Sequence, residues 1–254
     1  MFNITNNPDD SLFHTAPART GDIKRKFIGE KLKELGVNIS DISLGDFDFI
    51  GEFTAKKQRP RDSELYNSVG AFFRPNYERG ILIHTLIKKF QLKSYLEIGF
   101  GRGYSCMCAA MAMAENGGGS VTTVDPNLDE NHLKNLGGVL PQEWFSLTKF
   151  AKCTSDQFFQ QVNENYDLIF IDGDHRYDAV RNDWKNTAEK YDRFLLFDDY
   201  HLPGKEQKDI EVSGLVDSID DTSKELIIMD RRIFFDDRRI SDDQIDYGQV
   251  LLTK

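Results

Sequence analysis

The sequence predicts an α/β fold built on a mainly parallel sheet. Short apolar strand patterns alternate with helical patterns between about residues 94 and 199. Parallel strands need crossover connections, which are almost always right-handed and usually helical. A second observation is that glycine or aspartate follows several of these strands. Ligands bind at the carboxyl ends of the strands in such sheets, so the same pattern predicts where the functional residues lie.

The N-terminal part of the chain lacks this alternation. Residues 1–20 are polar and contain two prolines, which predicts an extended arm. Residues 23–35 place apolar side chains at helical spacing, and Gly36 follows as a stop signal. Residues 38–75 mix short apolar runs with glycine and proline, which predicts little regular structure. We therefore divide the chain into an N-terminal segment, residues 1–75, and one large domain, residues 76–254.

The large domain divides into regular elements. Helical patterns cover residues 79–90, 104–114, 129–140, 155–163 and 177–191. Strand patterns cover residues 94–99, 120–125, 145–151, 166–172 and 193–199. The helix at 104–114 is apolar on every side, so we expect it to be buried. The last strands are predicted at 225–230 and 248–254, with a hairpin at 232–237 between them, which would add antiparallel strands at one edge.

Composition limits the function. The net charge of −10 in a chain of 254 residues is wrong for a protein that binds nucleic acid. No run of about 18 apolar residues is present, so no membrane span is expected. The three cysteines predict neither disulfides nor zinc, and with no signal-peptide pattern they suggest a cytoplasmic protein. The charged segment 231–239 could protect a sheet edge or form a dimer contact.

A glycine turn follows the first strand of the large domain. Gly99, Gly101 and Gly103 alternate with other residues, so the backbone can turn tightly and approach a ligand. The helix that begins at Tyr104 and Ser105 then presents free amide groups. The dinucleotide fingerprint would need its third glycine where Tyr104 stands, so NAD is disfavoured.

An acid follows the second strand. Asp125 stands 22 residues beyond Gly103, where a carboxylate can accept hydrogen bonds from both hydroxyls of a ribose. The alternative is a turn formed for packing, with Asp125 as the cap of the next helix. The glycine turn, the acid and the alternating pattern together favour a nucleotide-like cofactor.

This region resembles the class I S-adenosylmethionine-dependent methyltransferases. Their first motif, acid-x-Gly-x-Gly-x-Gly, is matched by Glu97, Gly99, Gly101 and Gly103, and their ribose-binding acid by Asp125. The resemblance implies a Rossmann-like seven-stranded sheet with helices on both faces. It also implies S-adenosylmethionine as cofactor, with further contacts from Tyr104, Ser105, Ser155, Asp156 and Asp172, of which Ser155 and Asp156 match by position only.

Carboxylates and a histidine follow the fourth and fifth strands. Asp172 ends the fourth strand, three residues before His175, and Asp198 and Asp199 end the fifth. Adjacent parallel strands would bring these carboxylates together, where they cannot all stay ionised without a cation. Oxygen ligands suit Mg²⁺, with Mn²⁺ or Ca²⁺ as alternatives. Each motif could also be an ordinary turn or helix cap.

The second group resembles metal-dependent O-methyltransferases of small molecules. In that branch an Asp-x-x-His motif and an acidic pair stand at these two strand ends. The resemblance implies that Asp172, Asp198 and Asp199 hold the metal and that His175 is the general base. Residues 1–75 would form the variable lid of the branch. We expect the remaining histidine of this region, His201, to lie in a solvated loop.

These observations predict an S-adenosylmethionine-dependent O-methyltransferase that acts on a hydroxyl of a small molecule, such as a sugar or natural product, with Mg²⁺ and with His175 as base. One alternative is a metal-independent methyltransferase that acts on a small-molecule amine or hydroxyl. Another is a non-catalytic protein that keeps the fold. A nucleic-acid base methyltransferase is disfavoured, because a [DNS]-P-P-[YF] motif does not follow the fourth strand.

Overall fold

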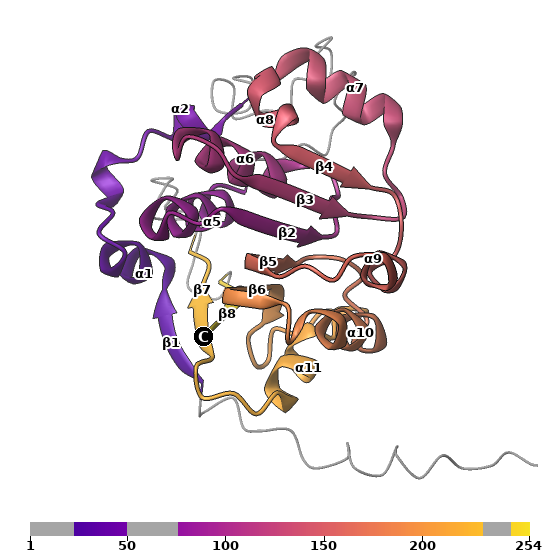
Figure 1. The fold of residues 1–254 in the computed structure, drawn as a ribbon. Helices are drawn as coiled ribbons and strands as arrows, with labels where there is room; N and C mark the ends of the chain where they lie inside the picture. The colour runs from indigo at the N-terminus through magenta and orange to yellow at the C-terminus, as the bar shows by residue number, and fades with distance from the viewer. Residues whose placement is uncertain (1–22, 50–75, 231–244) are drawn as a thin grey trace, which may run out of the picture.

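The strands of the protein form one eight-stranded sheet (Figure 1). The computed structural model describes residues 23–49, 76–230 and 245–254. The strand order is β1-β7-β8-β6-β5-β2-β3-β4, and β8 alone runs antiparallel to its neighbours. The strands are β1 (Lys24–Phe27), β2 (Ser94–Ile98), β3 (Ser120–Val124), β4 (Thr148–Ala151), β5 (Tyr166–Ile171), β6 (Tyr191–His201), β7 (Glu225–Ile228) and β8 (Tyr247–Thr253).

Helices cover both faces of the sheet (Figure 1). The large domain contains α5 (Tyr77–Phe90), α6 (Tyr104–Glu115), α7 (Glu130–Val139), α8 (Gln142–Ser146), α9 (Ser155–Gln161), α10 (Tyr177–Thr187) and α11 (Val212–Ser218). The N-terminal segment contributes α1 (Ile28–Glu34), a 3₁₀ turn (Ile39–Asp41) and α2 (Leu44–Phe47). None of the described helices is long and apolar enough to cross a bilayer.

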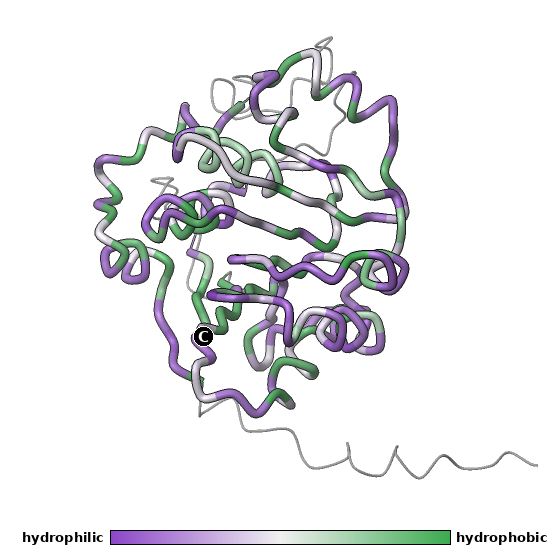
Figure 2. The backbone as a smooth tube through the Cα atoms, in the orientation of Figure 1, coloured by the Kyte–Doolittle hydropathy of each residue, from purple (hydrophilic) through white to green (hydrophobic). Residues whose placement is uncertain are grey.

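Two apolar cores fix the helices to the sheet. One contains α1, α5 and α6, and the other contains α9, α10 and α11. Figure 2 shows hydrophobic residues along the sheet strands and hydrophilic ones over much of α7 and α10. Ten consecutive residues of α6, from 104 to 113, are buried, which confirms the prediction of a buried helix. The sheet thus acts as a rigid platform whose carboxyl edge presents the loops of the site.

The structure corrects the prediction for the N-terminal segment. Residues 24–27, predicted as the start of a helix, form β1 and pair in parallel with β7, so the sheet has eight strands rather than seven. The helix begins only at Ile28 and ends at Glu34, just before Gly36, whose φ is +84°. Glu225 of β7 forms ion pairs with Lys26 and Lys31, which attach this segment to the edge of the sheet.

Most of the predicted elements of the large domain are confirmed, with local differences. The predicted strand at 145–151 is β4, which starts later because α8 occupies residues 142–146. The short helix α11 was not predicted. The predicted arm at residues 1–20, the predicted hairpin at 232–237 and the charged segment 231–239 all lie outside the described residues.

Candidate active site

A cavity of about 650 Å³ lies at the carboxyl ends of β2, β3, β4 and β5. Six residues predicted to bind a cofactor border it, namely Gly99, Gly101, Asp125, Ser155, Asp156 and Asp172. His175, the predicted base, borders it as well. Four others do not, namely Glu97, Gly103, Tyr104 and Ser105, all of which are buried. The topology therefore gathers residues from four strand ends around one space.

The glycine turn requires glycine for two physical reasons. Gly99 has a φ of +94°, and a Cβ there would lie 2.1 Å from the backbone oxygen of Asp172. Gly103 has a φ of +89°, and a Cβ there would overlap the ring of Phe100. Only glycine adopts such backbone angles without strain and leaves room for such close contacts. The turn therefore packs directly against the end of β5.

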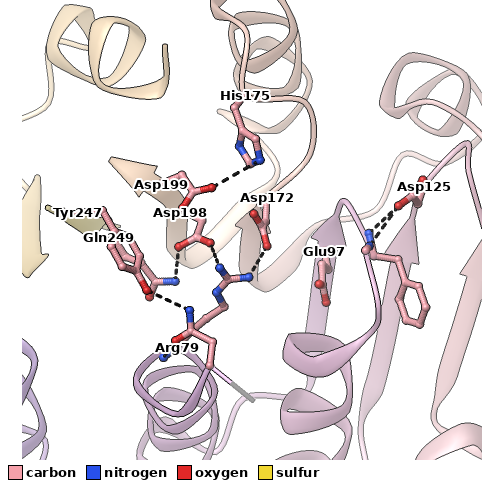
Figure 3. Close-up of polar contacts among 12 residues, drawn as sticks. Arg79, Glu97, Asp125, Asp172, His175, Asp198, Asp199, Tyr247 and Gln249 are labelled. Carbon is pink, nitrogen blue, oxygen red and sulfur yellow. Dashed lines mark hydrogen bonds and ion pairs between the residues drawn. The ribbon is translucent and has the colours of Figure 1, made fainter. Parts of the chain in front are cut away.

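Asp125 holds the other side of this turn (Figure 3). Its Oδ2 accepts hydrogen bonds from the backbone nitrogens of Phe100 at 3.0 Å and Gly101 at 3.3 Å. Its Oδ1 accepts a further bond from Asn127 N at 2.7 Å. The carboxylate thus stabilises the turn while it borders the cavity. The predicted contact with a ribose stays a prediction.

Glu97 lies beneath the turn, with 1% of its surface exposed. Tyr95 Oη donates a hydrogen bond of 3.3 Å to its Oε2. Burial raises the pKa of the Glu97 carboxyl well above its usual range, although the charge of Arg79 opposes this. A carboxyl in this environment is more easily kept neutral, and it lies in the structural layer below the cavity.

The far wall of the cavity contains an acid that the sequence did not single out. Ser155 Oγ donates a hydrogen bond of 2.5 Å to Oδ1 of Asp183, which lies on α10. Thr154 caps α9 and so fixes the direction of Ser155. Burial raises the pKa of Asp183 to about 6, and the hydrogen bond from Ser155 opposes this rise.

A second unpredicted residue, Arg79 of α5, lies between two of the predicted metal ligands (Figure 3). Its Nη1 is 2.5 Å from Asp172 Oδ2, and its Nη2 forms an ion pair with Asp198 Oδ2. Gln249 donates a hydrogen bond of 2.9 Å to Asp198 Oδ1. The Asp198 side chain is fully buried. Asp198 is thus surrounded by donors from α5 and β8.

The charges in this group are unbalanced. Burial raises the pKa of Asp172 well above its usual range, with the neighbouring carboxylates adding to the rise and Arg79 opposing it. Burial and Asp198 likewise raise the pKa of Asp199. Burial alone would lower the pKa of Arg79, but Asp172 and Asp198 raise it. The guanidinium therefore remains the fixed positive charge of the group.

Asp198 and Asp199 are consecutive strand residues, so their side chains point in different directions, and β6 is also irregular at this point. The register with β8 shifts between Phe197 and Tyr200, and Asp199 has a φ of +50°. Bulges and positive φ values often re-aim side chains at functional sites. Here Asp199 Oδ2 comes within 3.5 Å of His175 Nε2 (Figure 3).

Within the described ranges, one group of three residues could surround a metal ion. It contains Asp172, His175 and Asp199, whose ligand atoms lie within 4.8 Å of one another. Of the predicted ligands, Asp172 and Asp199 belong to this group, whereas Asp198 is held by Arg79 and Gln249. A ligand role for the three aspartates stays a prediction.

A smaller cavity, of about 270 Å³, lies beyond Asp199. Polar side chains provide most of its wall, among them Asn76, Arg79, His201, Gln207 and Asp246. His201 is 5% exposed at the end of β6, so the expectation of a solvated loop histidine was wrong. The two cavities share none of their described lining residues.

Comparison with protein families decides the assignment. Residues 96–200 match the model of a family described as a methyltransferase domain. Over this stretch the chain is similar to a methyltransferase domain. The match runs from β2 to the end of β6, which is the part of the chain that forms both strand-end groups of the site. The predicted resemblance to class I methyltransferases is therefore confirmed.

Solved structures share the fold of this chain beyond the matched residues. An O-methyltransferase from Bacillus cereus in complex with SAH is 14% identical, with 89% of this chain and 97% of that chain covered and a TM-score of 0.53. The cofactor-bound protein Rv0187 from MTB is 15% identical, with 82% and 93% covered and a TM-score of 0.54. No curated protein matches the sequence.

Proposed function

We propose that the protein is an S-adenosylmethionine-dependent O-methyltransferase of small polar molecules, with His175 as the general base. The observation that supports this most strongly is the position of the His175–Asp199 pair. His175 borders the larger cavity and Asp199 borders the smaller one, while their nearest side-chain atoms are 3.5 Å apart. A methyl group could thus pass between two adjoining spaces beside a proton acceptor.

The larger cavity has the features that such a methyl donor needs. The glycine turn lets the ligand approach the backbone, and Asp125 presents a carboxylate at the end of β3, where a ribose is expected. The Bacillus cereus structure of the same fold was solved with SAH, and Rv0187 with a cofactor. Bound S-adenosylmethionine would supply a methyl group that already reacts readily with nucleophiles.

The chain must then position the acceptor and remove its proton. His175 Nε2 would accept the proton of the acceptor hydroxyl, and Asp199 would orient the imidazole and stabilise its protonated form. A general base contributes roughly 10²–10⁴-fold to such a rate. Correct alignment of the reacting atoms can contribute on the order of 7–11 kcal/mol.

The smaller cavity is proposed to bind the acceptor. Its volume of about 270 Å³ is small for a ligand site, and its wall is rich in hydrogen-bonding groups. This favours a compact molecule with several hydroxyls, such as a sugar unit, over a large flat aromatic compound. An amine is a second candidate, because Asp199 and Asp246 both border this cavity and would attract a positive charge.

The arrangement around Arg79 favours a mechanism in which Asp172, Asp198 and Asp199 do not share one Mg²⁺ ion. Asp172 and Asp198 share the guanidinium of Arg79, and a divalent cation between them would meet that positive charge. If Asp172, His175 and Asp199 bound a metal ion, His175 would be one of its ligands and could not also accept the proton. We therefore propose that proton removal proceeds without a metal ion, with Arg79 as the cation that neutralises Asp172 and Asp198.

The proposal is tested in two stages. Calorimetry with S-adenosylmethionine and SAH should detect binding to the purified protein. Transfer of labelled methyl from S-adenosylmethionine is then measured against hydroxylated sugars, the corresponding amino sugars and catechols, and mass spectrometry locates the methyl group. Binding without transfer to any hydroxyl would refute the O-methyltransferase assignment, and N-methylation would establish the amine alternative.

A further inference from the structure

We propose that Asp183 selects the adenine ring of the cofactor by accepting a hydrogen from its amino group. This inference rests on the proposed use of S-adenosylmethionine. It concerns a buried acid that the proposed chemistry does not use, since Asp183 lies on α10 and borders the larger cavity, whereas proton removal is assigned to His175 and Asp199. The resemblance of the sequence to known methyltransferases assigns no role to Asp183.

The environment of Asp183 leaves one oxygen free for a ligand. Asp183 is 7% exposed, and Ser155 occupies its Oδ1 through the 2.5 Å hydrogen bond. In the described part of the chain, no hydrogen bond reaches its Oδ2. This oxygen is therefore accessible from the cavity and lacks a donor among the described residues, so a ligand that supplies an N–H can pair with it.

Gly173 keeps this oxygen open to the cavity. A Cβ at this position would lie 3.3 Å from Asp183 Oδ2, and Gly173 itself borders the cavity. Its φ lies outside the left-handed region, so backbone conformation does not require a glycine there. The lack of a side chain instead leaves the space in front of the carboxylate free.

The layout of the cavity places a base, rather than the reacting sulfur, at this position. The sulfur must face His175, and a ribose is expected at Asp125 on the end of β3. Ser155 lies just after β4, one strand further out in the sheet than β3, and its hydrogen bond holds Asp183 of α10 against this wall, with the Asp183 Oδ2 facing Gly173 after β5. Adenine presents an amino group that can donate to a carboxylate, whereas hypoxanthine presents a carbonyl oxygen there.

Asp156 is the competing candidate and supplies the matched control. It also borders the cavity, but it is exposed, and Asn186 Nδ2 donates a 2.8 Å hydrogen bond to its Oδ1. An exposed acid keeps its contacts with water, so it discriminates less between ligands than a buried one. The two acids can be separated by the same conservative substitution.

The experiment measures binding of SAH and of S-inosylhomocysteine by calorimetry at pH 8, where Asp183 is ionised. The unmodified protein should prefer SAH by on the order of 10- to 100-fold. With S-inosylhomocysteine, the hypoxanthine carbonyl oxygen would face Asp183 Oδ2, and neither of these two oxygens would have a hydrogen-bond donor. Asp183→Asn can still accept from Ser155, and its amide can donate to the hypoxanthine carbonyl. This variant should lose or reverse the preference, whereas Asp156→Asn should keep it.

Other results would overturn the inference. Equal binding of both ligands to the unmodified protein, or loss of the preference in Asp156→Asn alone, would exclude Asp183 as the selecting residue while the proposed function stands. Absence of SAH binding would refute both. If Asp183→Asn does not fold, Gly173→Ala provides the second test, because its methyl group should cover Oδ2 and reduce the preference for SAH.

Discussion

Arg79 shows how a single side chain can determine the character of a site. Its guanidinium bridges Asp172 and Asp198, which come from adjacent strands. Removal of one partner from a buried ionic group leaves uncompensated charge, which typically costs 3–5 kcal/mol. We expect Arg79→Ala to lower the free energy of unfolding by about that amount, as measured by urea denaturation.

Arg79→Lys is the matched control for this prediction. It keeps the charge but cannot bridge two carboxylates in the same planar geometry, so its loss should be smaller. Equal stability of Arg79→Ala and the unmodified protein at pH 7 would show that the bridge contributes nothing.

His175 can be tested separately from the binding of the cofactor. His175→Gln should reduce turnover by roughly 10²–10⁴-fold, because a glutamine side chain cannot take up the proton. Its affinity for SAH should change by less than about 3-fold, since the base acts on the acceptor. His84→Gln is the control, because His84 contacts Glu115 on the outer side of α5 and α6. Unchanged turnover in His175→Gln would exclude His175 as base.

At the scale of elements, the turn between β2 and α6 is the least replaceable connection. Gly99→Ala would place a methyl group 2.1 Å from the backbone oxygen of Asp172 and would also strain a φ of +94°. We expect this variant to lose SAH binding and at least about 1–3 kcal/mol of stability. Gly117→Ala isolates the backbone effect, because Gly117 has a φ of +77° but open space around it. Similar losses in both variants would show that the close contact at Gly99 is unimportant.

The elements also show what local sequence can predict. Strands β2, β3 and β5 and helix α6 are recognisable because their own residues are apolar in a characteristic pattern, and burial follows directly. In contrast, β1 has the sequence KRKF, which contains no strand pattern, and becomes a strand through its pairing with β7. Such a strand depends on residues about 200 positions away.

The residues of the site also divide into those that local sequence predicts and those that only the folded structure reveals. Asp172 was predictable because it directly follows β5, and Asp198 and Asp199 because they lie close to the carboxyl end of β6, which continues to His201. Arg79 precedes Asp172 by 93 residues on a helix from another part of the chain, and no local pattern indicates that it reaches the site. Asp183 looks like an ordinary residue of a charged helix, and only the packing of α10 beside Ser155 reveals its position.

At the scale of the whole molecule, Asp183 links stability to pH. Burial raises its pKa from 3.8 to about 6, so the folded protein binds this proton more tightly than the unfolded chain. Its contribution to stability is therefore favourable at low pH and is lost as pH rises through about 6. Asp183→Asn should be more stable than the unmodified protein by up to about 3 kcal/mol at pH 8 and by little at pH 4, as measured by urea denaturation. An equal difference at both pH values would contradict this assignment.

The need for metal is also a property of the whole assembly of charges. With Arg79 as the resident cation, dialysis against EDTA should leave turnover within about 2-fold of its initial value, since neutralisation does not depend on an added ion. Addition of Mg²⁺ or Mn²⁺ to the dialysed protein should not increase it. Loss of activity on dialysis and its recovery with Mg²⁺ would instead establish the metal-dependent mechanism.

The separate linings of the two cavities have a kinetic consequence. Because the larger and smaller cavities share no described lining residue and adjoin at the His175–Asp199 and Arg79–Asp172 pairs, neither occupant needs to pass through the other's cavity. Donor and acceptor should then bind in random order. SAH would then compete only with S-adenosylmethionine, so a high concentration of acceptor should not relieve inhibition by SAH.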